Sequence, residues 1–128
     1  MNNYKPEGYN SVSPYLIVNG AERMISLLIE VFSAVPTRRF NTPDGKIMHA
    51  EIRLDDSVIM ISEASDQYPQ NNSLLHVYVQ DSDQVYQRAL DAGCEDMGAP
   101  KKSEGDSDKR GMFKDFAGNI WAVSTQEA

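Results

Sequence analysis

The chain has 128 residues and a formal net charge of −7 at pH 7. This length fits a single domain, residues 1–128, and the negative charge repels phosphate backbones, so we expect no nucleic-acid partner. No apolar run approaches the roughly eighteen residues of a membrane span, and the first residues lack a signal-peptide core. The single cysteine, Cys94, excludes an internal disulfide and fits a reducing compartment. We therefore expect a cytoplasmic protein with no membrane partner.

The first half of the chain predicts a strand, a helix and further strands. Residues 1–10 are polar and form a mobile lead-in by this interpretation, and residues 14–18 read as a β-branched strand. The helix should begin near Asn19, which can cap it while Glu22 reaches back, and it should end before Pro36. Residues 37–40 then predict a short strand, followed by a turn at residues 42–45.

A β-hairpin closes the first half, with residues 47–54 turning at Asp55-Asp56 into residues 57–61. A two-residue turn pairs Leu54 with Ser57 and Ile52 with Ile59. Strand alternation then gives the hairpin one apolar face, which helices must cover, and one mixed face. The apolar face holds Met48, Ala50, Ile52, Leu54, Ile59 and Ile61; the mixed face holds His49, Glu51, Arg53, Val58, Met60 and Ser62.

The second half repeats this order of elements. Residues 74–80 predict a strand, Asp81 caps a helix that ends at Gly93, and residues 101–109 predict a polar loop. A last hairpin turns at residues 116–118 and carries Trp121 toward the core. Val79 lies 61 positions after Val18, and the closing hairpins are 62 positions apart. Two weakly matching units of strand, helix and strands are therefore predicted.

Two curved half-sheets leave a concave face, and concave faces bind small molecules. By alternation, the side chains on this face that suit a ligand are Tyr15, His49, Glu51, Met60, His76 and Tyr78. Aromatic and methionine side chains with a few polar groups suit a planar or amphipathic organic ligand. Alternatively, His49 is held by Ser62 across the hairpin, and Glu51 pairs with Arg53 or Lys114.

Several segments resemble the vicinal oxygen chelate superfamily, which includes glyoxalase I, extradiol dioxygenases, fosfomycin-resistance enzymes and bleomycin-binding proteins. The similarity covers about residues 11–125, and it is carried by residues 14–18, 43–52, 55–60, 79–83 and 115–121. It implies an α+β fold of two βαβββ modules, about residues 11–64 and 73–126. In this fold the modules form a U-shaped, mostly antiparallel sheet with the helices on the convex side. Members commonly form dimers.

The resemblance also implies where a metal would bind in the metal-dependent relatives. Carried onto this chain, the four ligand positions are Ser13, Met60, Leu74 and Ala122. None is His, Glu or Asp, and a neutral hydroxyl with a thioether and aliphatic groups cannot hold a hard divalent cation. We therefore expect no metal and no other cofactor. A relocated site at His49, Glu51 and His76 is the alternative.

These observations favour a metal-independent protein that binds a small organic ligand. The alternative is a metal-dependent lyase, isomerase or dioxygenase-like enzyme that uses the relocated site, and no catalytic residue is assigned. A third interpretation is a degenerate pocket in a protein whose role is association. The first helix is apolar over most of its girth (Leu27, Leu28, Ile29, Val31 and Phe32), so either a second subunit or a longer segment should cover it. We prefer a homodimer.

Overall fold

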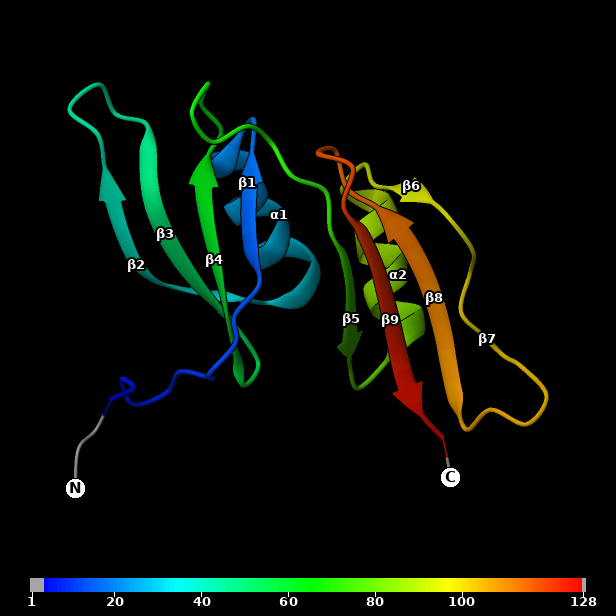
Figure 1. Cartoon of the computed structure of the whole chain (residues 1–128). Helices are drawn as coiled ribbons and strands as arrows, with labels where there is room; N and C mark the ends of the chain where they lie inside the picture. The colour runs from blue at the N-terminus through cyan, green and yellow to red at the C-terminus, as the bar shows by residue number, and fades with distance from the viewer. Residues whose placement is uncertain (1–3, 128) are drawn as a thin grey trace. The chain divides into compact units, whose positions relative to one another are not determined.

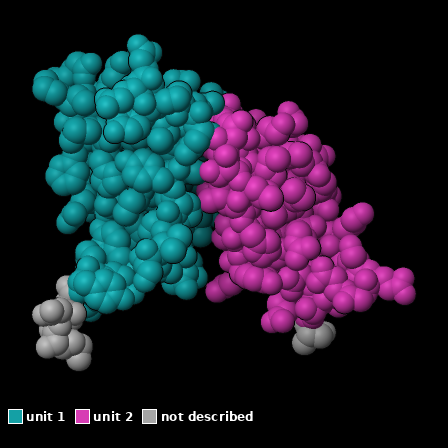
Figure 2. All heavy atoms as spheres, viewed as in Figure 1, with its two compact units in different colours: residues 1–71 teal, residues 72–128 magenta. Residues whose placement is uncertain are grey.

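The computed structural model describes residues 4–127, and these divide after Asn71 into two compact units. Unit 1 comprises the chain up to Asn71, and unit 2 begins at Asn72 (Figure 2). Each unit holds one helix and one sheet. Neither helix is long and apolar enough to cross a membrane.

Unit 1 is a four-stranded sheet with one helix packed on it (Figure 1). Its elements are β1 (Tyr15–Val18), α1 (Ala21–Phe32), β2 (Val35–Asn41), β3 (Ile47–Leu54) and β4 (Ser57–Glu63). The strand order is β1-β4-β3-β2. β1 runs parallel to β4, and the other neighbours are antiparallel, as the strand–helix connection and the hairpin require.

Unit 2 repeats this arrangement with one additional short strand. Its elements are β5 (Leu74–Tyr78), α2 (Ser82–Asp91), β6 (Glu95–Asp96), β7 (Lys101–Lys102), β8 (Asp108–Lys114) and β9 (Ile120–Gln126). The order is β5-β9-β8-β6, and β7 also pairs with β8. The prediction of one continuous loop over residues 101–109 was wrong at both ends, because Lys101 and Lys102 pair with Arg110 and Lys109.

Strand pairing confirms the internal repeat. Leu16 of β1 lies opposite Ile61 of β4, and Val77 of β5 lies opposite Val123 of β9. Val77 lies 61 positions after Leu16, and Val123 lies 62 positions after Ile61, the same spacings that relate the two halves of the sequence. The α+β class and the two strand–helix–strand modules are therefore confirmed.

The predicted register of the first hairpin is also confirmed, with Leu54 opposite Ser57 and Ile52 opposite Ile59. Its apolar face is buried, and Ile52 is only 1% exposed. Met48 is the exception at 58%. Phe40 pairs with His49 whereas Asn41 pairs with Ile47, so Met48 is the extra residue of a β-bulge, which takes its side chain off the buried face.

The two helices have different N-terminal caps, and the cap of α1 is not the predicted one. Asn19 does not cap α1: Gly20 occupies the N-cap position with a φ of 102°, a conformation that suits glycine. The carboxylate of Glu63 accepts hydrogen bonds from the backbone N–H groups of Gly20 at 3.0 Å and Ala21 at 2.9 Å. Asp81 caps α2 as predicted, accepting from the Gln84 N–H at 3.2 Å.

Candidate functional site

The face of the unit 1 sheet that points away from α1 carries a chain of hydrogen-bonded side chains, and we call it the open face. The Tyr15 hydroxyl lies 3.0 Å from His49 Nδ1, and His49 Nε2 lies 2.7 Å from Glu51 Oε2. The Tyr9 hydroxyl donates to the other carboxylate oxygen, Glu51 Oε1. Two tyrosines, one imidazole and one carboxylate are thus linked in a single chain.

The carboxylate at the centre of this chain fixes where the protons lie. Burial alone would raise the pKa of Glu51, but the hydrogen bonds from Tyr9 and His49 and the positive charge of Arg38 outweigh it and hold that pKa below its ordinary value. An ionised carboxylate only accepts hydrogen bonds, so His49 Nε2 must carry a proton. In the tautomer with this proton on Nε2, Nδ1 of His49 accepts a hydrogen bond from the Tyr15 hydroxyl.

Two of the cavities on unit 1 are lined by members of this chain. The larger measures about 880 Å³ and is lined by residues that include Tyr15, Ile17, Ser62 and Tyr68. The smaller measures about 540 Å³, with Glu51, Met60 and Arg38 on the sheet side. Both volumes lie in the range of small-molecule sites. Tyr15 therefore lines one cavity, while Glu51 lines the other.

The segment before β1 builds one wall of the smaller cavity, a role that the sequence interpretation missed. The residues of this segment that line the cavity are Tyr4, Lys5, Pro6, Tyr9, Asn10, Ser11 and Ser13. Gly8, with a φ of +87°, lets this segment lie against Arg53, because a Cβ at this position would stand 3.0 Å from Arg53 Nη2. The prediction of a mobile lead-in is not supported for Tyr9, which bonds Glu51; residues 1–3 lie outside the described residues. The aromatic residues of this otherwise polar segment were the feature of the sequence that could have indicated its contact with the sheet.

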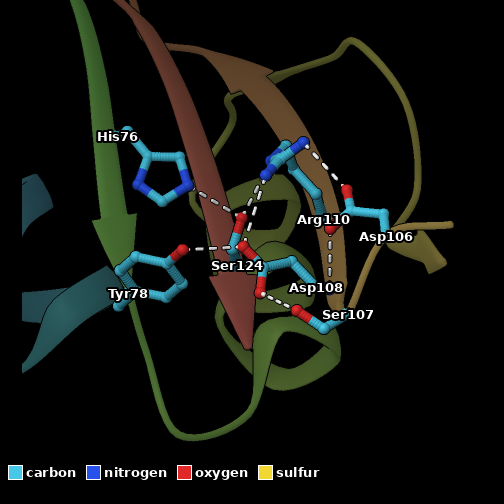
Figure 3. A network of polar contacts seen from close by, with 7 residues as sticks. All are labelled: His76, Tyr78, Asp106, Ser107, Asp108, Arg110 and Ser124. Carbon is cyan, nitrogen blue, oxygen red and sulfur yellow. Dashed lines mark hydrogen bonds and ion pairs between the residues drawn. The ribbon is translucent and has the colours of Figure 1, made fainter. Parts of the chain in front are cut away.

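Unit 2 carries a different polar network on β5, β8 and β9 (Figure 3). His76 Nε2 lies 2.9 Å from the buried Ser124 Oγ, which also accepts from Arg110 Nε at 3.0 Å. The Tyr78 hydroxyl donates to Asp108 Oδ2 at 2.7 Å, and this bond raises the pKa of Tyr78. Arg110 reaches Asp106 and Asp108, each at 3.4 Å.

The six predicted ligand residues thus fall into two groups. Tyr15, His49 and Glu51 are linked by hydrogen bonds, and Met60 lines the smaller cavity beside Glu51. His76 and Tyr78 belong to unit 2, where their rings pack edge to face with centroids 4.7 Å apart. Within unit 1, His49 bonds Tyr15 and Glu51 in place of Ser62, and Glu51 bonds Tyr9 and His49 in place of Arg53.

The four positions that would hold a metal in relatives do not fit one here. Ser13 and Met60 line the smaller cavity, Leu74 is 70% exposed and Ala122 is buried. A hydroxyl, a thioether and two aliphatic side chains do not form a donor set for a divalent cation. Within residues 4–127, no three His, Cys, Asp or Glu side chains are grouped so that they could hold a metal ion.

Comparison with known proteins gives the fold. No family model matches the sequence. The structure of TioX from Micromonospora sp. ML1 superimposes with a TM-score of 0.72 at 17% identity, covering 91% of this chain and 99% of TioX. A member of the glyoxalase/bleomycin resistance protein/dioxygenase superfamily from Sphaerobacter thermophilus matches with a TM-score of 0.67 at 12% identity, covering 89% of this chain and 94% of its own. This chain has the vicinal oxygen chelate fold.

Two further similarities connect this vicinal oxygen chelate fold to other proteins. TnmS3 from Streptomyces sp. CB03234, described as an antibiotic binding protein, matches with a TM-score of 0.69 at 15% identity, covering 93% of this chain and all of TnmS3 at 100%. In sequence, the uncharacterised protein Mb0911c of Mycobacterium bovis is 29% identical over 124 residues, covering 88% of this chain and 81% of its own length. At these identities the structural similarities concern the fold.

Proposed function

We propose that this protein is a cytoplasmic, metal-independent binding protein for a small organic ligand, which occupies the open face of unit 1. The observation that carries the proposal is the hydrogen-bonded chain of Tyr9, Glu51, His49 and Tyr15, whose members line two cavities. Apolar walls supply affinity in such sites, and a few fixed polar groups orient the ligand. Met60 and Tyr15 supply polarisable and aromatic surface here.

The chemistry of the open face favours binding over metal-dependent catalysis. Both carboxylate oxygens of Glu51 and both ring nitrogens of His49 already have protein partners. Two side chains so engaged hold each other in place and are preorganised to orient a ligand. The antibiotic binding protein TnmS3 has the same fold and supports a ligand-binding role for it.

A neutral aromatic fluorophore, N-phenyl-1-naphthylamine, tests the proposal. It should bind saturably, with enhanced fluorescence, to the wild-type protein. Met60→Trp should weaken binding about tenfold or more, because the indole fills the smaller cavity beside Glu51. Met97→Trp is the matched control, since Met97 is 39% exposed and lies in unit 2. The proposal fails if neither this fluorophore nor its sulfonated analogue, 8-anilinonaphthalene-1-sulfonate, binds saturably, or if the two variants weaken binding equally while keeping the wild-type thermal stability.

The enzyme alternative is distinguished by metal titration. Thermal-shift measurements with Ni²⁺, Mn²⁺, Zn²⁺ and Fe²⁺ should give no stabilisation, because only a ligand that prefers the native state raises the melting temperature. A stabilisation that His49→Ala and Glu51→Gln both abolish would instead support the relocated metal site.

We also propose a homodimer. Unit 1 buries most apolar side chains of α1 within one chain: Ala21, Met24, Ile25, Leu27, Leu28 and Val31. Ile29 remains 42% exposed, and β2 is an exposed edge strand of its sheet that includes Val35 and Phe40. Light scattering over a range of protein concentrations should give twice the chain mass, and a constant monomer mass would contradict the proposal.

A further inference from the structure

The smaller cavity of unit 1 carries positive charge, although the chain as a whole is strongly negative. Lys5 and Arg38 line it, against the single carboxylate of Glu51. That carboxylate accepts hydrogen bonds from Tyr9 on one oxygen and from His49 on the other. Each carboxylate oxygen of Glu51 therefore already accepts a hydrogen bond, whereas Lys5 and Arg38 still have N–H groups that can donate to a ligand.

Arg38 lies where an ion pair with Glu51 would ordinarily form, and none forms. The two residues are direct cross-strand partners in the pairing of β2 with β3. Opposite charges at such positions attract each other. The Arg38 guanidinium nevertheless has no hydrogen bond or ion pair with any residue of the described range 4–127, and it lies 5.9 Å from the centroid of the Phe40 ring. Tyr9 and His49 have taken the carboxylate instead.

The next residue along the strand shows the ordinary arrangement. Arg39 forms a two-pronged ion pair with Glu22 of α1, through bonds of 2.9 and 2.8 Å. In unit 2, Arg110 is likewise held by Asp106 and Asp108. Arg38 differs from both because its planar set of N–H donors faces a cavity without a protein anion bound to it.

The larger cavity has the opposite balance of charge. Lys46 lines it together with Glu63 and Asp66. The two cavities therefore offer different environments to the two ends of a ligand on the same face, and only the smaller one favours an anion.

We propose that the smaller cavity binds the anionic group of the ligand, a carboxylate or sulfonate on an aromatic or other apolar body, with Arg38 as its principal partner and Lys5 beside it. This inference rests on the proposed function, since it names the chemical class of the same ligand. A planar guanidinium matches the two oxygens of such a group. The charge of Glu51 acts on Arg38 only through space, because Tyr9 and His49 bond its carboxylate oxygens.

Two fluorescent probes with the same ring system test the inference on the full-length protein. 8-Anilinonaphthalene-1-sulfonate carries an anionic group, and N-phenyl-1-naphthylamine lacks it. The sulfonate should bind more tightly to the wild type, and Arg38→Gln should weaken its binding about tenfold while leaving the neutral probe within twofold. Arg39→Gln is the matched control, because it changes the net charge equally and removes a side chain that is paired with Glu22.

The outcomes separate this inference from the function on which it rests. If both probes bind and Arg38→Gln affects them equally, or if Arg39→Gln weakens the sulfonate as much, the anion site is refuted while small-molecule binding stands. If neither probe binds saturably, the proposed function fails and this inference fails with it. A selective loss of sulfonate binding in Arg38→Gln supports both.

Discussion

The two units share one backbone pattern and use it for different chemistry. His76 of unit 2 lies 61 positions after Tyr15, and Arg110 lies 61 positions after His49. The pairing registers agree, since Tyr15 lies opposite Met60 and His76 lies opposite Ala122. Equivalent positions on the same strands therefore hold a tyrosine and a histidine in unit 1, and a histidine and an arginine in unit 2.

The difference lies in the partners of the polar side chains on these strands. In unit 1 the buried carboxylate of Glu51 accepts hydrogen bonds from Tyr9 and His49. In unit 2 the equivalent position is Met112, and a cation, Arg110, is held by Ser124 and two aspartates instead. A repeat conserves backbone geometry because hydrogen-bond register fixes it, whereas the side chains on the uncovered face are free to differ.

The turns of the two closing hairpins offer the first and largest test of this comparison. Asp115 is buried, and its carboxylate accepts from the N–H groups of Ala117, Asn119 and Trp121, the last through the indole at 2.9 Å. Asp115→Ala should lower the free energy of unfolding by about 3 kcal/mol, since several buried donors lose their acceptor. Chemical denaturation measures this loss.

Unit 1 provides the control for that substitution. Asp56 lies in the exposed two-residue turn of the first hairpin, where it accepts a hydrogen bond from the Ser57 hydroxyl at 3.0 Å. Asp56→Ala should change stability by less than about 0.5 kcal/mol. Equal losses in the two variants would show that the turns are not energetically different.

The helix N-termini give the second test, because equivalent residues contact them in both units. Glu63 bonds the N–H groups of Gly20 and Ala21, and Thr125, 62 positions later, accepts from Ser82 at 2.9 Å. Glu63→Ala should cost about 2 kcal/mol, because a charged acceptor serves two donors at the helix N-terminus. Thr125→Ala should cost about 1 kcal/mol.

Thermal denaturation of the two variants beside Glu22→Ala checks this order. Glu22 is an exposed first-turn residue of α1 that pairs with Arg39, so its loss should cost no more than about 0.5 kcal/mol. A larger loss for Thr125→Ala than for Glu63→Ala would contradict the greater role of the carboxylate.

Local pattern predicted the fold well. Strand alternation placed Ile52 and Ile59 in the core, the Asp55-Asp56 turn set the hairpin register, and Asp81 was identified as a helix cap. Each of these depends on residues close together in the sequence. Alternation failed at Met48, where a β-bulge shifts the register between β2 and β3, because alternation alone does not locate a bulge.

Contacts between distant residues escaped prediction for the same reason. Glu63 contacts the start of α1 from 42 positions away, and Tyr9 contacts Glu51 from the same separation. Strand alternation placed Tyr15, His49 and Glu51 on one face, but it did not show that these side chains form hydrogen bonds with one another. Only the folded sheet brings the lead-in segment onto that face, where Tyr9 bonds Glu51 and Arg38 forms no ion pair with this cross-strand partner.

The Tyr9 bond gives the third test, through the pH dependence of unit 1. The folded pKa of Glu51 lies below its ordinary value of 4.5, so this group stabilises the fold above that pH. The contribution is lost as the pH falls through the folded pKa. Tyr9→Phe should raise the folded pKa of Glu51 toward 4.5 and move acid unfolding to higher pH.

Carbon-13 NMR titration of the Glu51 carboxyl measures this change directly. Tyr4→Phe is the matched control, because Tyr4 lines the same cavity and is 86% exposed. If both variants shift the Glu51 titration equally, the effect comes from the cavity wall and not from the Tyr9 hydroxyl.

The smallest expected effect concerns the corresponding tyrosine bond of unit 2. The hydrogen bond to Asp108, with that residue's negative charge, raises the pKa of Tyr78 above its ordinary value of 10.0. This bond stabilises the fold below that pH, and the contribution is lost as the pH rises through the folded pKa. Asp108→Asn should return the tyrosinate transition of Tyr78, followed by ultraviolet absorbance, toward 10.0. Asp106→Asn should shift it less, because Asp106 acts on Tyr78 only through space. Equal shifts would mean that the charges near Arg110, and not the bond to Asp108, set the pKa of Tyr78. The polar network of unit 2 would then act as a cluster of charges, unlike the hydrogen-bonded chain of unit 1.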